Sequence, residues 1–119
     1  KRFFFEAYIE SFKGNYAYLS GYFSKELKNK IFDNESLNKN FIVSENLKLR
    51  LGESNSTKVL AVMSVGTKVK ILDTGKVEII DDIKSNWVKV EVLSGAKDRD
   101  GKPIKKGTVG WCYGGYLTD

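Results

Sequence analysis

The residue types that support most enzyme chemistry are nearly missing from this chain of 119 residues. It contains no histidine and a single cysteine, Cys112. A Ser-His-Asp triad or a Cys–His dyad therefore lacks its base, and a zinc site lacks its usual ligands. Cys112 stands between two aromatic residues on an alternating segment, which is typical of a small buried hydrophobe. We expect no catalytic residue, no metal and no cofactor, and we expect that the protein is not an enzyme.

Two short acidic motifs do not change this expectation. Asp81 and Asp82 form a carboxylate pair, but no second acidic group at a defined spacing indicates acid–base catalysis. Asp98 and Asp100 precede a glycine, as in a calcium loop. Five cationic side chains within ten residues oppose a divalent cation there.

Aromatic side chains at the ends of predicted strands offer a different chemistry, which is binding. Trp87, Tyr113 and Tyr116 present amphipathic rings that give contact area at low entropic cost, and Tyr113 precedes a glycine pair where backbone can approach a ligand. Arg50 alternates with two leucines, so it points away from the core and is able to bind a carboxylate through its fork. We predict a shallow groove formed by these four residues. The competing interpretations are core packing for the rings and a surface ion pair for Arg50.

The basic residues are spread along the chain, with one local concentration. The net charge is +5, of which residues 1–40 contribute +2 (7 basic, 5 acidic) and residues 41–119 contribute +3 (13 basic, 10 acidic). The concentration is a predicted hairpin arm over residues 95–107, which carries Lys97, Arg99, Lys102, Lys105 and Lys106. This arm is either a contact for phosphate or an acidic polymer, or a solvated hairpin tip partly neutralised by its two aspartates.

Composition divides the chain at about residue 40. With 41% hydrophobic and 29% charged residues, the chain is typical of one globular domain with an appendage. Valine is absent before this point, where nearly all the phenylalanine lies. From residue 41 onward, strand-sized apolar runs separated by turn residues predict a mainly β domain over residues 41–119. The runs are 47–51, 58–64, 68–72, 76–80, 87–93 and 109–113.

Residues 1–40 form an aromatic N-terminal extension. Ser24 is an N-cap candidate, and an apolar i,i+4 pair follows it, so we predict a short helix over residues 25–32. The polar run 33–40 is typical of a linker. Residues 4–23 align with the closing hairpin of the β domain, which favours the last hairpin of a preceding repeat. An i,i+4,i+8 series of aromatic residues favours a helix there instead.

Five blocks after residue 42 carry a family resemblance. They read ENLKLRLGESNS (45–56), KVLAVMSVG (58–66), TKVKIL (67–72), NWVKV (86–90) and GWCYGGYL (110–117). In this order they resemble the bacterial SH3-like (SH3b) domain family, over roughly residues 42–118. The chain departs from the family pattern at Glu53, where a proline is usual, and in two longer segments, 73–86 and 95–107.

The resemblance implies a small, partly open antiparallel SH3-like barrel. It also implies a non-catalytic module of the cell envelope, periplasm or exterior that binds peptidoglycan peptides, other peptides or a protein partner. Two alternatives remain open at this stage. One is a structural or assembly domain that docks or self-associates through residues 1–23. The other, less favoured, is a small basic barrel that binds nucleic acid.

Overall fold

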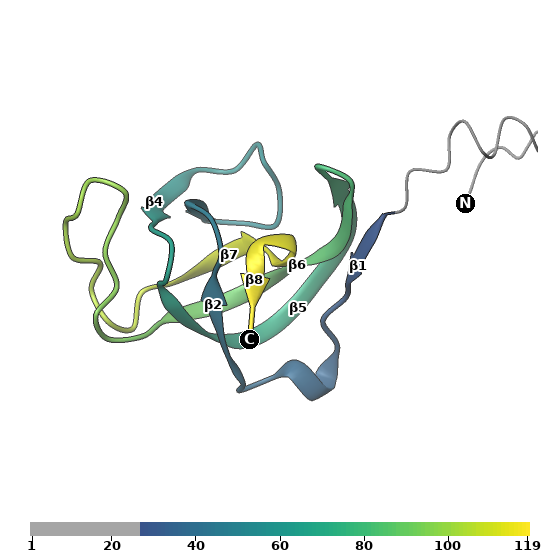
Figure 1. Ribbon diagram of the computed structural model, residues 1–119, viewed down its shortest axis with the longest axis horizontal. Helices are drawn as coiled ribbons and strands as arrows, with labels where there is room; N and C mark the ends of the chain where they lie inside the picture. Colours follow the sequence, from purple (N-terminus) through teal and green to yellow (C-terminus); the bar gives the residue numbers. More distant parts are fainter. Residues whose placement is uncertain (1–26) are drawn as a thin grey trace, which may run out of the picture.

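The computed structural model describes residues 27–119. The predictions for residues 4–23, and residues 25 and 26 of the predicted helix, lie outside the described residues. The described chain contains eight strands and two short 3₁₀-helices (Figure 1). In chain order these are β1 (Lys28–Lys30), η1 (Asn34–Ser36), β2 (Asn40–Val43), β3 (Leu47–Arg50), β4 (Val59–Met63), β5 (Lys68–Ile80), β6 (Ile83–Val92), β7 (Val109–Tyr113), η2 (Gly114–Tyr116) and β8 (Leu117–Thr118). Across residues 27–119, no helix has the length and apolar character needed to cross a membrane.

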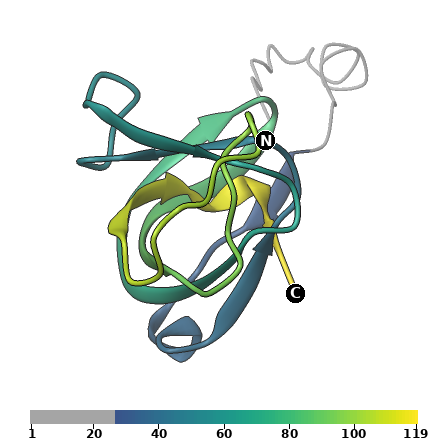
Figure 2. The same cartoon turned by 90° about the vertical axis from the view of Figure 1, so that its left-hand side faces the viewer.

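Strands β2–β8 form one antiparallel sheet that curls into a half-barrel (Figure 2). The strand order is β4-β3-β7-β6-β5-β2-β8, and β1 is added to β6 in parallel. No α-helix occurs in the described part of the chain. The prediction of a mainly β, antiparallel, partly open architecture is confirmed.

The core lies on the concave side of the curled sheet. In β6, Val88, Val90 and Val92 alternate with polar or aromatic residues and are fully buried. Successive side chains of a strand point to opposite faces, so one face of β6 supplies the centre of the core. The other strands contribute in the same way, and the remaining fully buried apolar side chains of the core cluster are Val43, Leu49, Met63, Val69, Ile71, Cys112 and Leu117.

The longest part of the sheet is the β5–β6 ribbon (Figure 1). Register shifts interrupt the pairing between Ile71 and Asp73 and between Thr74 and Val77, and such irregularities bend a strand. At Gly75, in the second irregularity, an added Cβ would lie 2.3 Å from the Glu53 carboxylate and 2.8 Å from the Trp111 ring. Gly75 therefore permits a close approach, and a larger residue there would require the Glu53 and Trp111 side chains to move.

The turn between β5 and β6 is shorter than its sequence predicts. The polar run 81–86 predicts a loop, whereas Ile80 pairs with Ile83 and only two residues connect the strands. Asp81 and Asp82 have φ angles of 54° and 62°, and positive φ at both central residues is what a type I′ turn requires. The prediction of two separate strands, 68–72 and 76–80, was likewise wrong, because β5 continues through the bend.

The predicted helix over residues 25–32 was wrong where the structure describes it. Lys28–Lys30 is a strand that pairs with Ile83–Ser85 of β6. The apolar pair that predicted a helix, Leu27 and Ile31, does not form the buried face of one, because both side chains are exposed. Tertiary pairing with a free sheet edge has overridden a short local pattern.

The segment after β1 is also part of the packed structure. The ring of Phe32 is buried against the core and meets Phe41 edge-on, with ring centroids 5.1 Å apart. Further along, the predicted linker contains η1, and backbone hydrogen bonds join Asn38 and Lys39 to Ile71 of β5. Residues 28–40 therefore contribute directly to the folded sheet.

Candidate functional site

The four residues predicted to form a groove line one cavity. Arg50 comes from β3, Trp87 from β6, Tyr113 from β7 and Tyr116 from η2, and together they border a space of about 340 Å³. Its other lining residues are Asn46, Leu47, Lys48, Asn55, Ile80 and Asp81. The structure therefore brings together residues that are up to 66 positions apart in the sequence.

The aromatic floor of this groove stands on the sheet face opposite the core. Trp87 precedes the buried Val88 and is paired in register with Tyr113, so both rings leave the sheet on its other side. Trp87 and Tyr113 lie edge-on at 5.7 Å, and Tyr113 and Tyr116 at 6.1 Å. The three rings form a continuous series, which we call the aromatic row.

Trp87 is buried and held in a fixed orientation. Its ring is only 2% exposed, and its Nε1 donates a 2.7 Å hydrogen bond to Oε1 of Glu78 on the neighbouring strand. A buried indole N–H usually finds such a partner. Trp87 is therefore buried, as the core-packing interpretation expects, and it also lines the groove.

Tyr113 is the most constrained member of the row. Its side chain is 3% exposed. The hydroxyl accepts a hydrogen bond from the N–H of Ser85 and donates toward the carbonyl oxygens of Glu78 and Ile83, at 2.5 and 2.6 Å. Burial raises the pKa of the phenol above its usual value, although the hydrogen bond from Ser85 opposes that change. The hydroxyl therefore makes its hydrogen bonds within the β5–β6 ribbon. Only an edge of the Tyr113 ring is left to contact a ligand.

The glycine pair after Tyr113 serves the fold and not a ligand. An added Cβ at Gly114 would lie 2.7 Å from the Phe32 ring and from Ser85 Oγ, and one at Gly115 would lie 2.6 Å from the Tyr113 ring. Both glycines are buried. The close approach predicted at this position exists, but protein atoms occupy the space, which corrects the reason for choosing Tyr113.

Tyr116 closes one end of the groove. Its hydroxyl donates a hydrogen bond to Oδ2 of Asp81 at the β5–β6 turn. Burial, followed by this hydrogen bond and the negative charge of Asp81, raises the pKa of Tyr116. Tyr116 therefore keeps its proton across the physiological pH range and ties the tip of the ribbon to η2.

Two cationic side chains from β3 also line the cavity. Arg50 is half-buried, and its Nη1 donates a 2.7 Å hydrogen bond to the carbonyl of Thr57, which orients the guanidinium. Lys48 lies two residues earlier on β3 and faces the same cavity. Sequence reasoning missed Lys48, although the alternation that placed Arg50 outward applies equally to it. Asp81 was considered only as a catalytic group, and its place in the groove depends on the curl of the ribbon.

The basic arm lies elsewhere on the molecule. It runs beside β4, with backbone hydrogen bonds from Ser64 to Lys97 and from Arg99 to Val62. At its tip, the Asp98 carboxylate accepts hydrogen bonds from the backbone N–H groups of Asp100 and Lys102. All five basic residues of the arm (Lys97, Arg99, Lys102, Lys105 and Lys106) are exposed, and none lines the groove.

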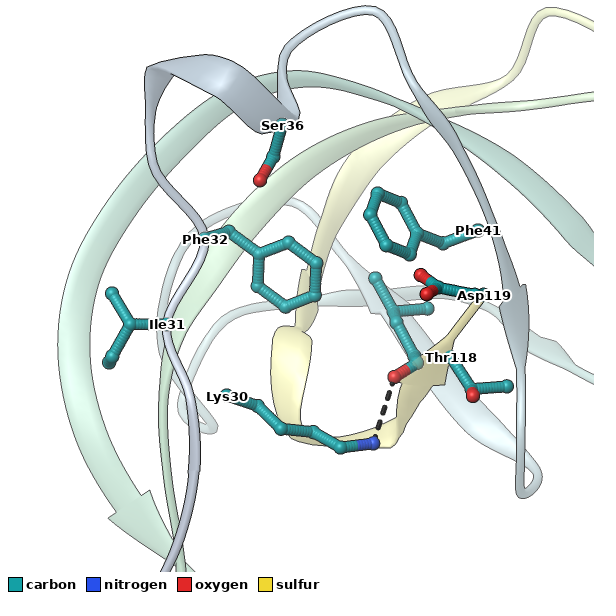
Figure 3. A pocket seen from close by; sticks show the side chains of 8 residues that line it. Lys30, Ile31, Phe32, Ser36, Phe41, Thr118 and Asp119 are labelled. Atoms are coloured by element: carbon teal, nitrogen blue, oxygen red, sulfur yellow. Dashed lines mark hydrogen bonds between the residues drawn. The ribbon is translucent and has the colours of Figure 1, made fainter.

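A second cavity of about 290 Å³ lies between β1, β2 and β8 and contains none of the predicted site residues (Figure 3). The rings of Phe32 and Phe41 face it, and Nζ of Lys30 crosses it to the carbonyl of Leu117 at 3.0 Å. This lysine hydrogen bond joins the N-terminal strand to the last strand of the sheet. The cavity therefore lies where β1 meets β8, and the Lys30 ammonium group is hydrogen-bonded across it.

Cys112 is fully buried in the core, and burial raises its thiol pKa to about 12. A thiol with such a pKa is protonated and unreactive at neutral pH. Among residues 27–119, no group of three or more His, Cys, Asp or Glu side chains is arranged to hold a metal ion.

Comparisons with known proteins add no relative. No family model, curated protein or solved structure matches this chain.

Proposed function

We propose that this protein is a non-catalytic bacterial SH3-like module that binds peptide-bearing cell-envelope material, or a peptide segment of a protein partner, in the groove described above. The five sequence blocks that resemble the SH3b family support the SH3-like assignment, and a curled antiparallel half-barrel is compatible with it. The family resemblance also supports a location in the cell envelope, the periplasm or the exterior.

One observation carries the proposal: Arg50, Trp87, Tyr113 and Tyr116, chosen from sequence as a binding set, line a single cavity. A cavity with aromatic walls and a few polar groups is the usual form of a small ligand site. The orienting contacts of Trp87 and Arg50 mean that a ligand meets side chains already in place, which reduces the entropy lost on binding.

The charges around the groove indicate the chemistry of the ligand. Lys48 and Arg50 stand on the β3 wall, and Asp81 stands at the β5–β6 turn. A guanidinium binds a carboxylate through two parallel hydrogen bonds, and a carboxylate attracts an ammonium group. A short peptide that carries both a free carboxylate and an amino group satisfies both walls, and stem peptides of the cell wall are of this kind.

Isothermal titration with a soluble muropeptide tests the proposal, with the peptide-free disaccharide as the ligand control. Loss of one charged hydrogen bond costs about 1.5–3 kcal/mol, so R50Q is expected to weaken binding by about tenfold or more. R99Q removes the same charge from the basic arm and is expected to leave binding unchanged. Equal binding by R50Q and the wild-type protein would contradict the proposed site.

A further inference from the structure

The end of the β5–β6 ribbon exposes an apolar face. Here β5, β6 and β1 lie side by side, with Ile79 paired to Lys84 and Lys84 paired to Asn29. Residues paired in register share a face, and so do residues two positions apart on a strand. Leu27 and Ile31 flank β1 directly, each two positions from Asn29, and continuing the alternation of the strand places them on the same face as Val77 and Ile79.

These four side chains are unusually exposed. The exposed fractions are 44% for Leu27, 45% for Ile31, 53% for Val77 and 55% for Ile79. Within residues 27–119 they are four of the nine exposed large hydrophobic residues. Single exposed apolar side chains are ordinary, whereas several on one face of a ribbon indicate an interaction surface, here with Lys84 of β6 between the two pairs. We call these four residues the ribbon patch.

The ribbon patch is separate from the groove. In β5 its members alternate with Glu78, which accepts the hydrogen bond from Trp87, and with Ile80, which lines the groove on the opposite face. Three polar residues share this face, and one of them is the exposed Asn29 between Leu27 and Ile31. Lys84 stands at its centre, and the side chain of Asn86 is already engaged with the backbone of Phe32.

We propose that the ribbon patch is the docking surface for this chain's own residues 3–23. Leu27 is both a member of the patch and the residue at which the upstream segment joins the described chain. That segment is rich in aromatic residues, since nine of the first 26 residues are Phe or Tyr. Such side chains gain about 25 cal/mol for each Å² of apolar surface removed from water.

Covalent continuity makes this occupant more suitable than a second copy of the chain. A tethered segment meets the patch at a high effective concentration, which strengthens a small contact. Four partly exposed side chains are few for a stable dimer, which needs roughly 800 Å² from each partner. A symmetric pair would also bring the central Lys84 residues of two copies together, and like charges repel.

Hydrogen exchange of the full chain tests the proposal. Backbone amides within residues 3–23 are expected to exchange at least tenfold more slowly than in an unstructured peptide. The double variant V77T/I79T is expected to remove this protection. The matched control L51T/V65T, which alters two residues that are more exposed and lie elsewhere, is expected to retain it. Absence of protection in the wild-type protein, or its persistence in V77T/I79T, would overturn the proposal.

Two further measurements keep the test decisive. Protection that increases with protein concentration would show that a second copy covers the patch and would also overturn the proposal. Nuclear Overhauser contacts from aromatic protons of residues 3–23 to the methyl groups of Ile79 are expected in the wild-type chain, so the result does not depend on how V77T/I79T folds. Their absence would contradict docking at this face.

Discussion

The side-chain amide of Asn86 forms both hydrogen bonds that a neighbouring strand would offer to Phe32. Its Oδ1 accepts from the Phe32 N–H at 2.9 Å, and its Nδ2 donates to the Phe32 carbonyl at 2.8 Å. Asn86 lies at the point of β6 where the pairing partner changes from β1 to β7. One side chain therefore satisfies the buried backbone where the sheet has no strand to do so.

The two hydrogen bonds between Asn86 and Phe32 predict a large loss of stability when the side-chain amide is removed. N86A leaves the buried N–H and carbonyl of Phe32 without these partners, and each such loss costs about 1–3 kcal/mol. We expect the free energy of unfolding, measured in urea, to fall by at least that amount. N29A removes an exposed amide from β1 and is expected to change it by about 0.5 kcal/mol or less. Equal stability of the two variants would refute the role of Asn86.

The two tyrosines of the groove predict losses of stability of different size from the same substitution. Y113F removes a buried hydroxyl that contacts three backbone groups, so a loss of about 1–3 kcal/mol in unfolding free energy is expected. Y116F removes a more exposed hydrogen bond to Asp81, so the expected loss is below about 1 kcal/mol. Urea unfolding of both variants measures the difference, and a larger loss in Y116F would contradict the structure.

Gly114 predicts a steric penalty that depends on position. An added methyl group at Gly114 meets Phe32, Ser85 and the Asn86 carbonyl within 2.8 Å, and the carbonyl is backbone that moves only at a cost. We expect G114A to lose about 1–3 kcal/mol in thermal or urea unfolding. At Gly52 the nearest atom is a side-chain methyl of Thr57 at 3.1 Å, so G52A is expected to lose less. A larger loss of stability in G52A than in G114A would show that Phe32 does not pack against Gly114.

The buried thiol predicts a loss of stability at alkaline pH. In the unfolded chain Cys112 ionises near pH 9, whereas in the folded protein its pKa is about 12. Between these values unfolding releases a proton from the thiol. The contribution of the buried, protonated thiol to the free energy of unfolding is therefore fully present below pH 9 and is lost as the pH rises toward 12. The slope is at most about 1.4 kcal/mol per pH unit. Urea unfolding between pH 8 and 11 should show a shallower fall for C112A, and identical slopes would contradict burial of the thiol.

Strand content and the outward position of the four groove residues could be predicted from the sequence because both depend on local alternation. Val88, Val90 and Val92 alternate with outward residues, and this pattern places the core without knowledge of the partner strands. The same reasoning put Arg50 on the outer face. The joint position of Trp87, Tyr113 and Tyr116 followed from their places at strand ends.

The remaining features depend on tertiary contacts that local patterns do not encode. Lys28–Lys30 becomes a strand only because the start of β6 offers an edge, and the polar run 81–86 is mostly strand because β5 pairs with it. Asn86 was interpreted as a turn residue, since nothing nearby in sequence shows that Phe32 lies beside it. The glycines after Tyr113 were assigned to ligand access, whereas Phe32 and the Tyr113 ring fill that space.

The two tryptophans provide the most direct test of the groove. Trp87 lines it through the aromatic row, whereas Trp111 lies outside it, over Gly75. In a ¹⁵N-labelled sample titrated with a soluble muropeptide, the indole N–H signal of Trp87 and the amide signals of Arg50 and Tyr116 should shift together and saturate. The indole signal of Trp111, which is paired with Arg50 but does not line the cavity, should shift less than that of Trp87. Shifts confined to the basic arm, or no shift at Trp87 and Tyr116 at saturating muropeptide, would contradict the groove as the binding site.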